Sequence, residues 1–241
     1  MPARHFRLGP RAGRDARPPE PALMKVCELL VYESLGYREA VVLQESYVNQ
    51  IAAGKEPEKL ILLQHPPVIT LGRGFHQQNL LFDSGWLREH GIAVEESGCG
   101  GDVTYHGPGQ VVGYPLLDIK DQPDLHRHLR NLEELMIRCA ADFGIDAGRK
   151  SGLTGAWVGD EKIGAIGVRV SKWITSHGFA LNVNTDLSPF EYIVPCGIRE
   201  HGVTSLQKIL GKDVPIRDVH ESLIRHFEQI FSRKVRPGKS S

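Results

Sequence analysis

The sequence has few cysteines, no excess of either charge and no long apolar run. Its 4 cysteines in 241 residues form no CxxC pair, which argues against a secreted disulfide framework. Lysine plus arginine number 29, and so do aspartate plus glutamate, so the chain lacks the basic excess of typical nucleic-acid-binding proteins. No segment approaches the ~18 consecutive apolar residues that a membrane-spanning helix needs. We therefore expect no nucleic-acid partner and no membrane span.

The first 24 residues also lack the features of a targeting signal. They are rich in arginine, proline and glycine and contain no apolar stretch, which is unlike a secretory signal. Their prolines argue against the amphipathic helix of a transit peptide. We predict a disordered tail over residues 1–24, a single domain over 25–232 and a frayed tail over 233–241, in a cytoplasmic protein.

Apolar periodicity predicts a mixture of strands and helices. Strand-like runs lie at 26–32, 59–64, 68–71, 92–96, 111–119, 154–158, 162–170 and 173–183. Helical spacing covers 37–53, 84–90, 125–143, 204–210 and 216–231, with Ser84 as the expected cap of the second helix. Several strands form apparent hairpins, and strands and helices do not alternate regularly, so the predicted fold class is α+β.

Sequence context separates the cysteines into two pairs. Cys27 lies in an apolar strand and Cys139 on the apolar stripe of a helix, where cysteine packs as a small hydrophobic residue. Cys99 and Cys196 lie in turns between glycine and proline residues. In such turns the backbone can approach a ligand. Cys99 and Cys196 are therefore equal candidates for a nucleophile.

A nucleophilic cysteine needs a group that lowers the pKa of its thiol, such as lysine or a protonated histidine. His106, Lys162 and His177, each close to glycines, are the candidates. Each also has a structural interpretation, as a surface hairpin lysine or a hydrogen-bonded turn histidine. A zinc site of two cysteines and two histidines is disfavoured, because these residues match no standard ligand spacing. We predict no metal.

The segment GCGGDVTYHGPGQ, residues 98–110, is the richest in glycine and proline. It does not match GxxxxGK[ST], so a phosphate-binding loop is not expected. It also lacks the strand–GxGxxG–helix context of a dinucleotide site. Its glycines are better suited to cradle an acyl chain and its carbonyl group.

Five motifs occur in order between about residues 25 and 230. They are QHPPVITLGR at 64–73, GGDVTYHGPGQVVGYPLLDI at 100–119, GAIGV at 164–168, HGFALNVN at 177–184 and IVPCGI at 193–198. Together they resemble the octanoyltransferases of lipoate biosynthesis. The resemblance implies a mixed sheet packed with helices, similar to the catalytic domain of biotin and lipoate protein ligases.

The resemblance also implies an activity, the first step of endogenous protein lipoylation. An octanoyl or lipoyl group would pass from acyl carrier protein to a lysine of the lipoyl domains of 2-oxoacid dehydrogenases or of the glycine-cleavage H protein. Cys196 would carry the acyl group as a thioester, and Lys162 would be the base. Thioester exchange costs little free energy, so no cofactor is implied. The implied acyl site comprises Cys99, Gly100, Gly101, Asp102, Val103, Thr104, Tyr105, His106, Ala165, Ile166, Gly167, Gly178, Phe179 and Ala180.

One position departs from the family pattern. The family has Arg-Gly-Gly where this chain has Cys99-Gly100-Gly101, and a thiol supplies neither the fixed charge nor the five donors of arginine. The change is either neutral or compensated elsewhere, or it alters activity and permits a disulfide between Cys99 and Cys196.

Two other classes of function remain open, an ATP-dependent ligase on the same fold and a non-enzymatic acyl- or metal-binding protein. An acidic carrier protein would require a local basic rim on a chain of zero net charge. The candidates for that rim are Arg73, Lys150, Arg169 and Lys172.

Overall fold

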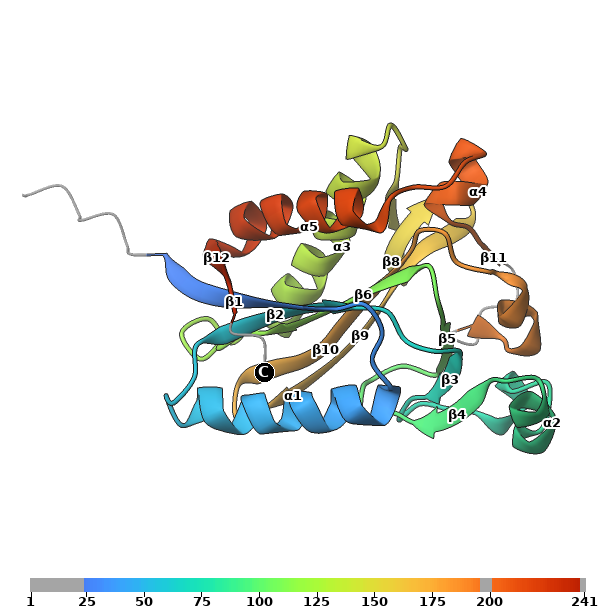
Figure 1. The fold of residues 1–241 in the computed structure, drawn as a ribbon, viewed down its shortest axis with the longest axis horizontal. Helices are drawn as coiled ribbons and strands as arrows, with labels where there is room; N and C mark the ends of the chain where they lie inside the picture. The colour runs from blue at the N-terminus through green and yellow to red at the C-terminus, as the bar shows by residue number, and fades with distance from the viewer. Residues whose placement is uncertain (1–23, 196–200, 239–241) are drawn as a thin grey trace, which may run out of the picture.

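The computed structural model describes residues 24–195 and 201–238 (Figure 1). The larger sheet contains β1 (Lys25–Tyr32), β2 (Glu58–Leu63), β6 (Gln110–Leu116), β7 (Gly148–Lys150), β8 (Leu153–Val158), β9 (Glu161–Ser171), β10 (Ile174–Asn182), β11 (Gly202–Val203) and β12 (Arg233–Pro237). The smaller sheet contains β3 (Val68–Leu71), β4 (Ala93–Glu96) and β5 (Val103–His106). The helices are α1 (Tyr37–Ala52), η1 (Gln77–Asn79), α2 (Ser84–Glu89), α3 (Leu125–Asp142), η2 (Ser188–Tyr192), α4 (Leu206–Leu210) and α5 (Ile216–Phe231).

The larger sheet is mixed. Its strand order in the described residues is β12-β1-β2-β6-β10-β9-β8-β7, with β11 paired to β9 outside this path. The strands β12, β1 and β2 are parallel, and the path from β2 to β7 is antiparallel. The smaller sheet has the order β4-β3-β5. These mixed sheets confirm the predicted α+β class.

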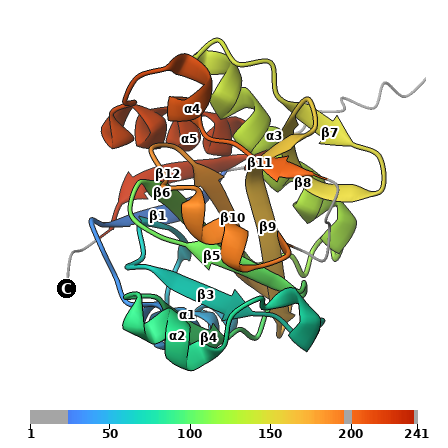
Figure 2. The ribbon, with the colours of Figure 1, turned by 90° about the vertical axis from the view of Figure 1, so that its right-hand side faces the viewer.

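Helices cover both faces of the larger sheet (Figures 1 and 2). Helices α3 and α5 lie on one face, and α1 lies on the other. The strand β2 shows how the sequence specifies this, because its consecutive side chains alternate between the faces. Leu60 and Leu62 join the core beneath α3 and α5, whereas Ile61 and Leu63 join the core beside α1. A strand buried on both faces reads as a continuous apolar run.

The two cysteines predicted to lie in the core are there. Cys27 and Cys139 are fully buried and belong to the core between the larger sheet and the helices α3 and α5. Burial raises the pKa of the Cys27 thiol well above its ordinary value, and raises that of Cys139 to about 12. Neither thiol is therefore a nucleophile near neutral pH.

Three local predictions were wrong. Residues 233–237 are not frayed, because they form β12, which pairs in parallel with β1 and is anchored by two contacts from Arg233 to Glu58 at 2.5 and 3.0 Å. Asp83, not Ser84, caps α2, since its carboxylate accepts hydrogen bonds from the N–H groups of Gly85 and Trp86. The glycine-rich segment also contains a strand, β5, which pairs with β3. No helix in the described part of the chain could cross a lipid bilayer.

Candidate functional site

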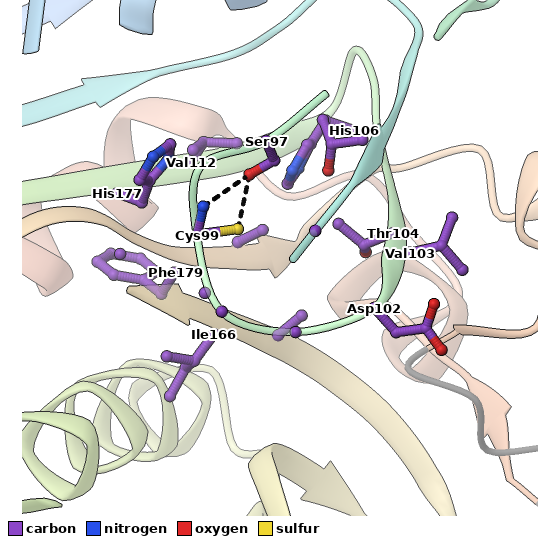
Figure 3. A pocket seen from close by; sticks show the side chains of 18 of the residues that line it. Ser97, Cys99, Asp102, Val103, Thr104, His106, Val112, Ile166, His177 and Phe179 are labelled. Carbon is purple, nitrogen blue, oxygen red and sulfur yellow. Dashed lines mark hydrogen bonds between the residues drawn. The ribbon is translucent and has the colours of Figure 1, made fainter. Parts of the chain in front are cut away.

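A cavity opens where the smaller sheet meets β9 and β10 of the larger one (Figure 3). The space within it, including its open mouth, is about 570 Å³. Of the predicted acyl-site residues, those that line it are Cys99, Gly100, Gly101, Asp102, Val103, Thr104, His106, Ala165, Ile166, Gly167, Gly178, Phe179 and Ala180. We refer to it as the main cavity.

Tyr105 is the predicted site residue that does not line the main cavity. Successive residues of a strand point to opposite faces, so Tyr105 lies on the other side of β5 from Thr104 and His106. Its ring packs edge-to-face against Phe190, with the centroids 5.5 Å apart. Tyr105 therefore packs on the face of β5 that points away from the main cavity.

Glycines on β9 and β10 allow the walls to come together. Gly167 and Gly178 are register partners on these strands. A Cβ atom at Gly178 would overlap the carbonyl oxygen of Gly113, and one at Gly167 would lie 3.1 Å from Cys99 Sγ. The small residues predicted to line the site thus have a steric reason for their size.

The glycine-rich loop is anchored by Asp102. Its carboxylate accepts hydrogen bonds from the backbone N–H of His76 at 3.2 Å and from the side-chain amide of Asn79. The N–H of Gly74 donates to the carbonyl of Gly101 at 2.8 Å. Figure 3 shows the Asp102 side chain directed away from Cys99 and Phe179. Asp102 therefore holds the loop in place and does not present its charge to the interior of the cavity.

Cys99 lies on the cavity wall. Its Sγ is 2.7 Å from Ser97 Oγ, which also accepts a hydrogen bond from the Cys99 backbone N–H at 3.2 Å (Figure 3). A hydroxyl–thiol contact thus occupies this part of the wall. The alternative disulfide with Cys196 falls outside the described residues, because Cys196 is not among them.

Two histidines, His106 and His177, line the inner end of the main cavity, and a third, His65, packs against the His106 ring behind them. All three are held in the uncharged form. Burial lowers the pKa of His65 to about 3 and that of His177 to about 4. Burial also lowers the pKa of His106. His65 Nδ1 lies 2.6 Å from the carbonyl oxygen of Leu35, which can only accept, so Nδ1 carries the proton. His65 Nε2 then accepts the hydrogen bond from the Tyr114 hydroxyl at 2.7 Å.

Two tyrosines complete this inner end. Burial raises the pKa of Tyr37 to about 12 and that of Tyr114 well above its ordinary value. The Tyr37 ring stacks on the His106 ring with the centroids 6.4 Å apart. All five titratable rings at the inner end are therefore neutral near pH 7, which suits an uncharged ligand.

Lys162 lies in a second, adjoining cavity of about 310 Å³. Both cavities share Thr104, Ala165 and Ala180 as lining residues. Lys162 is only 8% exposed, and its Nζ atom is 4.8 Å from the ring centroid of Trp157. Pro195, the residue before Cys196, lines this second cavity as well.

A chain of side-chain amides connects the two cavities. Gln110 Nε2 donates to Asn182 Oδ1 at 2.9 Å and to the carbonyl of Tyr105 at 3.2 Å. Because its nitrogen is thus committed, Gln110 Oε1 accepts the hydrogen bond from His106 Nδ1 at 2.6 Å. Asn182 Nδ2 in turn donates to the carbonyl of Thr204 at 2.9 Å. The network thereby fixes the tautomer of His106, with the proton on Nδ1, while burial lowers the pKa of the ring.

Sequence reasoning missed several residues of these two cavities. The polar signals were Gln110 and Asn182, each an amide at the end of an otherwise apolar strand. Nothing in the local sequence indicates the contributions of Tyr37, Tyr114 and Trp157, because they depend on how distant strands and α1 come together.

Only part of the proposed basic rim is brought together. Arg73 and Arg169 both lie close enough to His177 to help burial lower its pKa. Lys150 forms an ion pair with Asp160, next to the start of β9. Arg169 and Lys172 contact Glu45 and Asn49 of α1, near the far end of that strand. An eleven-residue strand is roughly 36 Å long, so Lys150 cannot share one docking point with Arg169 and Lys172. In the described residues no group of histidine, cysteine, aspartate and glutamate side chains is arranged to hold a metal ion.

Comparison with known proteins identifies the family. The model of the Lipoyl protein ligase A/B catalytic domain matches residues 36–228. An octanoyltransferase from Solibacter usitatus is 48% identical over 218 residues, which cover 90% of this chain and 98% of that protein. One from Geobacter metallireducens is 48% identical over 202 residues, which cover 83% of this chain and 92% of that protein.

Solved structures confirm the predicted fold. Lipoate-protein ligase A bound with ATP is similar with a TM-score of 0.72 at 21% identity, covering 90% of each chain. Biotin protein ligase from Aquifex aeolicus is similar with a TM-score of 0.50 at 13% identity, covering 85% of this chain and 69% of that one. At such identities the likeness concerns the fold alone. The chain belongs to the lipoyl protein ligase A/B catalytic domain family, in which the relatives that it matches at 48% identity are octanoyltransferases.

Proposed function

We propose that this chain transfers an octanoyl or lipoyl group from acyl carrier protein to the lysine of a lipoyl domain. The acceptors are the lipoyl domains of 2-oxoacid dehydrogenases and the glycine-cleavage H protein. The transfer proceeds through a thioester on Cys196, with Lys162 as the base. The observation that carries the proposal is the uncharged cavity, which adjoins a buried lysine and the residue that precedes Cys196.

The main cavity has the character that an alkyl chain requires. Its inner end is formed by neutral rings and by apolar groups such as Val112, Ile166 and Phe179 (Figure 3). A fatty acyl chain gains free energy from leaving water for such surroundings. Its thioester carbonyl would then lie toward Ala165 and Lys162, where the two cavities meet.

The chemistry requires one proton to move in each step. Lys162 Nζ takes the proton from Cys196 Sγ, and the thiolate attacks the carbonyl carbon of the donor thioester. The carrier thiolate leaves and takes the proton back from Lys162. In the second step the ε-amine of the acceptor lysine attacks the Cys196 thioester, gives one proton to Lys162 Nζ and releases the Cys196 thiolate, which then takes that proton back from Lys162. An amide bond replaces the thioester, and no ATP is consumed.

An ATP-dependent ligase is the second candidate, and the cavity walls disfavour it. Among the described residues that line the two cavities, Lys162 is the only lysine or arginine. A triphosphate is usually bound by several cationic side chains and by glycine-rich backbone that cradles the phosphates. A substrate that is already activated as a thioester fits this cavity better than free acid plus ATP.

Intact-mass measurement after mixing the protein with octanoyl-acyl carrier protein tests the proposal. The wild type should gain the mass of one octanoyl group, and hydroxylamine should remove it, as expected of a thioester. Cys196→Ala should gain none. Cys99→Ala is the matched control, because it removes the other loop cysteine and should still be acylated. An adduct that persists in Cys196→Ala and disappears in Cys99→Ala would reverse the assignment of the nucleophile.

The same assay separates the alternatives. Acylation from free octanoate that depends on ATP would favour the ligase. Binding of octanoate without any adduct would favour a non-enzymatic acyl-binding protein. The cytoplasmic location expected from the sequence stays a prediction.

A further inference from the structure

The indole ring of Trp157 lies against Lys162. Trp157 on β8 and Lys162 on β9 are register partners in an antiparallel pair, so their side chains project from the same face of the sheet. The Lys162 Nζ atom lies 4.8 Å from the ring centroid. Trp157 is 3% exposed and Lys162 is 8% exposed, so water screens this contact little.

The surrounding structure fixes the position of the ring. The register of β8 against β9 shifts between Ala156 and Trp157, and such an irregularity re-aims the side chain beside it. Gly155, just before it, has a φ of 124°, and its N–H donates to the buried carboxylate of Glu133 on α3 at 3.2 Å. The strand is therefore held by α3 at the point where the indole is directed toward Lys162.

The N–H group of this indole makes no hydrogen bond with the described residues. Trp157 Nε1 is buried and has no hydrogen-bond partner among the described residues. A buried donor without an acceptor is unfavourable, and a phenyl or aliphatic side chain would avoid this penalty. Lys162 contacts the face of this ring, with its Nζ atom over the indole.

We propose that Trp157 is a positioning residue that stabilises the ammonium form of Lys162. The inference rests on the proposed function, in which a proton passes from Cys196 Sγ to Lys162 Nζ. The negative face of an aromatic ring attracts a cation, most strongly for tryptophan and in desolvated surroundings. Trp157 thus favours the pair of Lys162 ammonium and Cys196 thiolate over the neutral pair, and so raises the fraction of reactive thiolate.

Replacement of Trp157 by fluorinated tryptophans tests this without changing the packing appreciably. Each fluorine withdraws electron density from the ring face and leaves the size of the indole nearly unchanged. The single-turnover rate of octanoyl transfer to the enzyme should fall stepwise with fluorine number, by about tenfold for the tetrafluoro ring. KM for octanoyl-acyl carrier protein should not change. The matched control is Trp173, which is 51% exposed and should show no trend.

The outcomes are distinct. Equal rates along the series at Trp157, or the same trend at Trp173, would overturn the inference. Trp157→Phe, which keeps an aromatic face, should react faster than Trp157→Leu; the reverse order would also overturn it. A wild type that forms no octanoyl adduct at all would instead refute the proposed function. An adduct in the wild type together with a flat fluorine series refutes only the role of Trp157.

Discussion

The inner end of the main cavity and the end that holds Lys162 differ in the neighbours of their buried titratable side chains. At the inner end of the main cavity, His65, His177 and Tyr114 are all buried and all neutral near pH 7. At the other end, Lys162 is also buried, yet it contacts an aromatic face that favours its charged form. Similarly buried groups thus have different neighbours, neutral rings at one end and the face of an indole at the other.

The difference follows from what each end has to do. A charged group at an inner end that receives an alkyl chain would be unfavourable, because its loss of hydration costs free energy. The outer end has to hold a proton for part of the reaction. Burial lowers the pKa of His65, whereas Lys162 lies against the ring of Trp157.

Removal of the Lys162 amine should have the largest effect. Lys162→Met keeps most of the apolar volume and deletes the base, so the rate of Cys196 acylation should fall about 10²- to 10⁴-fold. Single-turnover mass spectrometry measures this rate. Lys150→Met is the matched control, because Lys150 Nζ lies 5.5 Å from the same ring but is paired with Asp160. Equal rates in Lys162→Met and the wild type would transfer the role of base to another group, with His106 the next candidate.

Acidification should destabilise the fold, because the unfolded chain binds protons that the buried histidines of the folded chain do not bind. In the folded chain burial keeps the pKa of His65 near 3 and that of His177 near 4, below the ordinary value of 6.5. The unfolded chain therefore takes up protons as the pH falls through 6.5, whereas the folded chain does not. The free energy of unfolding should be largest above about pH 6.5 and should decrease below it, by roughly 1.4 kcal/mol per pH unit for each such histidine.

Urea titrations between pH 7 and pH 5 test this slope. The variant His65→Gln lacks one titrating group, so its free energy of unfolding should depend less steeply on pH, whatever its stability at pH 7. A slope identical to that of the wild type would mean that His65 is not held neutral by the fold.

A larger side chain at Cys99 should shorten the part of the main cavity that is available to the acyl chain. Cys99 Sγ already lies 3.1 Å from the position of a Cβ atom at Gly167, so Cys99→Leu has to extend into the cavity. We expect the ratio of kcat/KM for decanoyl over octanoyl donors to fall about tenfold, because the longer chain needs the space that leucine occupies. Cys99→Ser, which keeps the size, should change the ratio less than about twofold. A rise of the ratio in Cys99→Leu would place the end of the acyl chain elsewhere.

The elements predicted best were those whose apolar residues recur with a regular spacing and whose first and last residues are clearly marked in the sequence. The helix α5 begins and ends as expected, because its apolar residues recur at helical spacing. The strand β12 was missed since its sequence, RKVRP, contains a single apolar residue, and its pairing with β1 is long-range. The strand β5 was missed because the glycines and prolines around it are typical of loops.

The site was predictable where a motif marks it and unpredictable where the fold assembles it. Residues 99–104 and 165–167 were named from sequence, and they line the main cavity. Tyr37 and Trp157 were not, because nothing in their local sequence shows that α1 and β8 bring them to the site. The role of Cys196 stays a prediction, since that residue lies outside the part of the chain that the structure describes.

The pairing of β1 with β12 sets an order of events during synthesis. β1 is the first strand of the described chain, and its outer neighbour is the last. The outer edge of β1 therefore stays unpaired on the ribosome until residue 237 has left the exit tunnel. An unpaired edge can join to strands of other chains. The last strand of the described chain thus protects the edge of the first one.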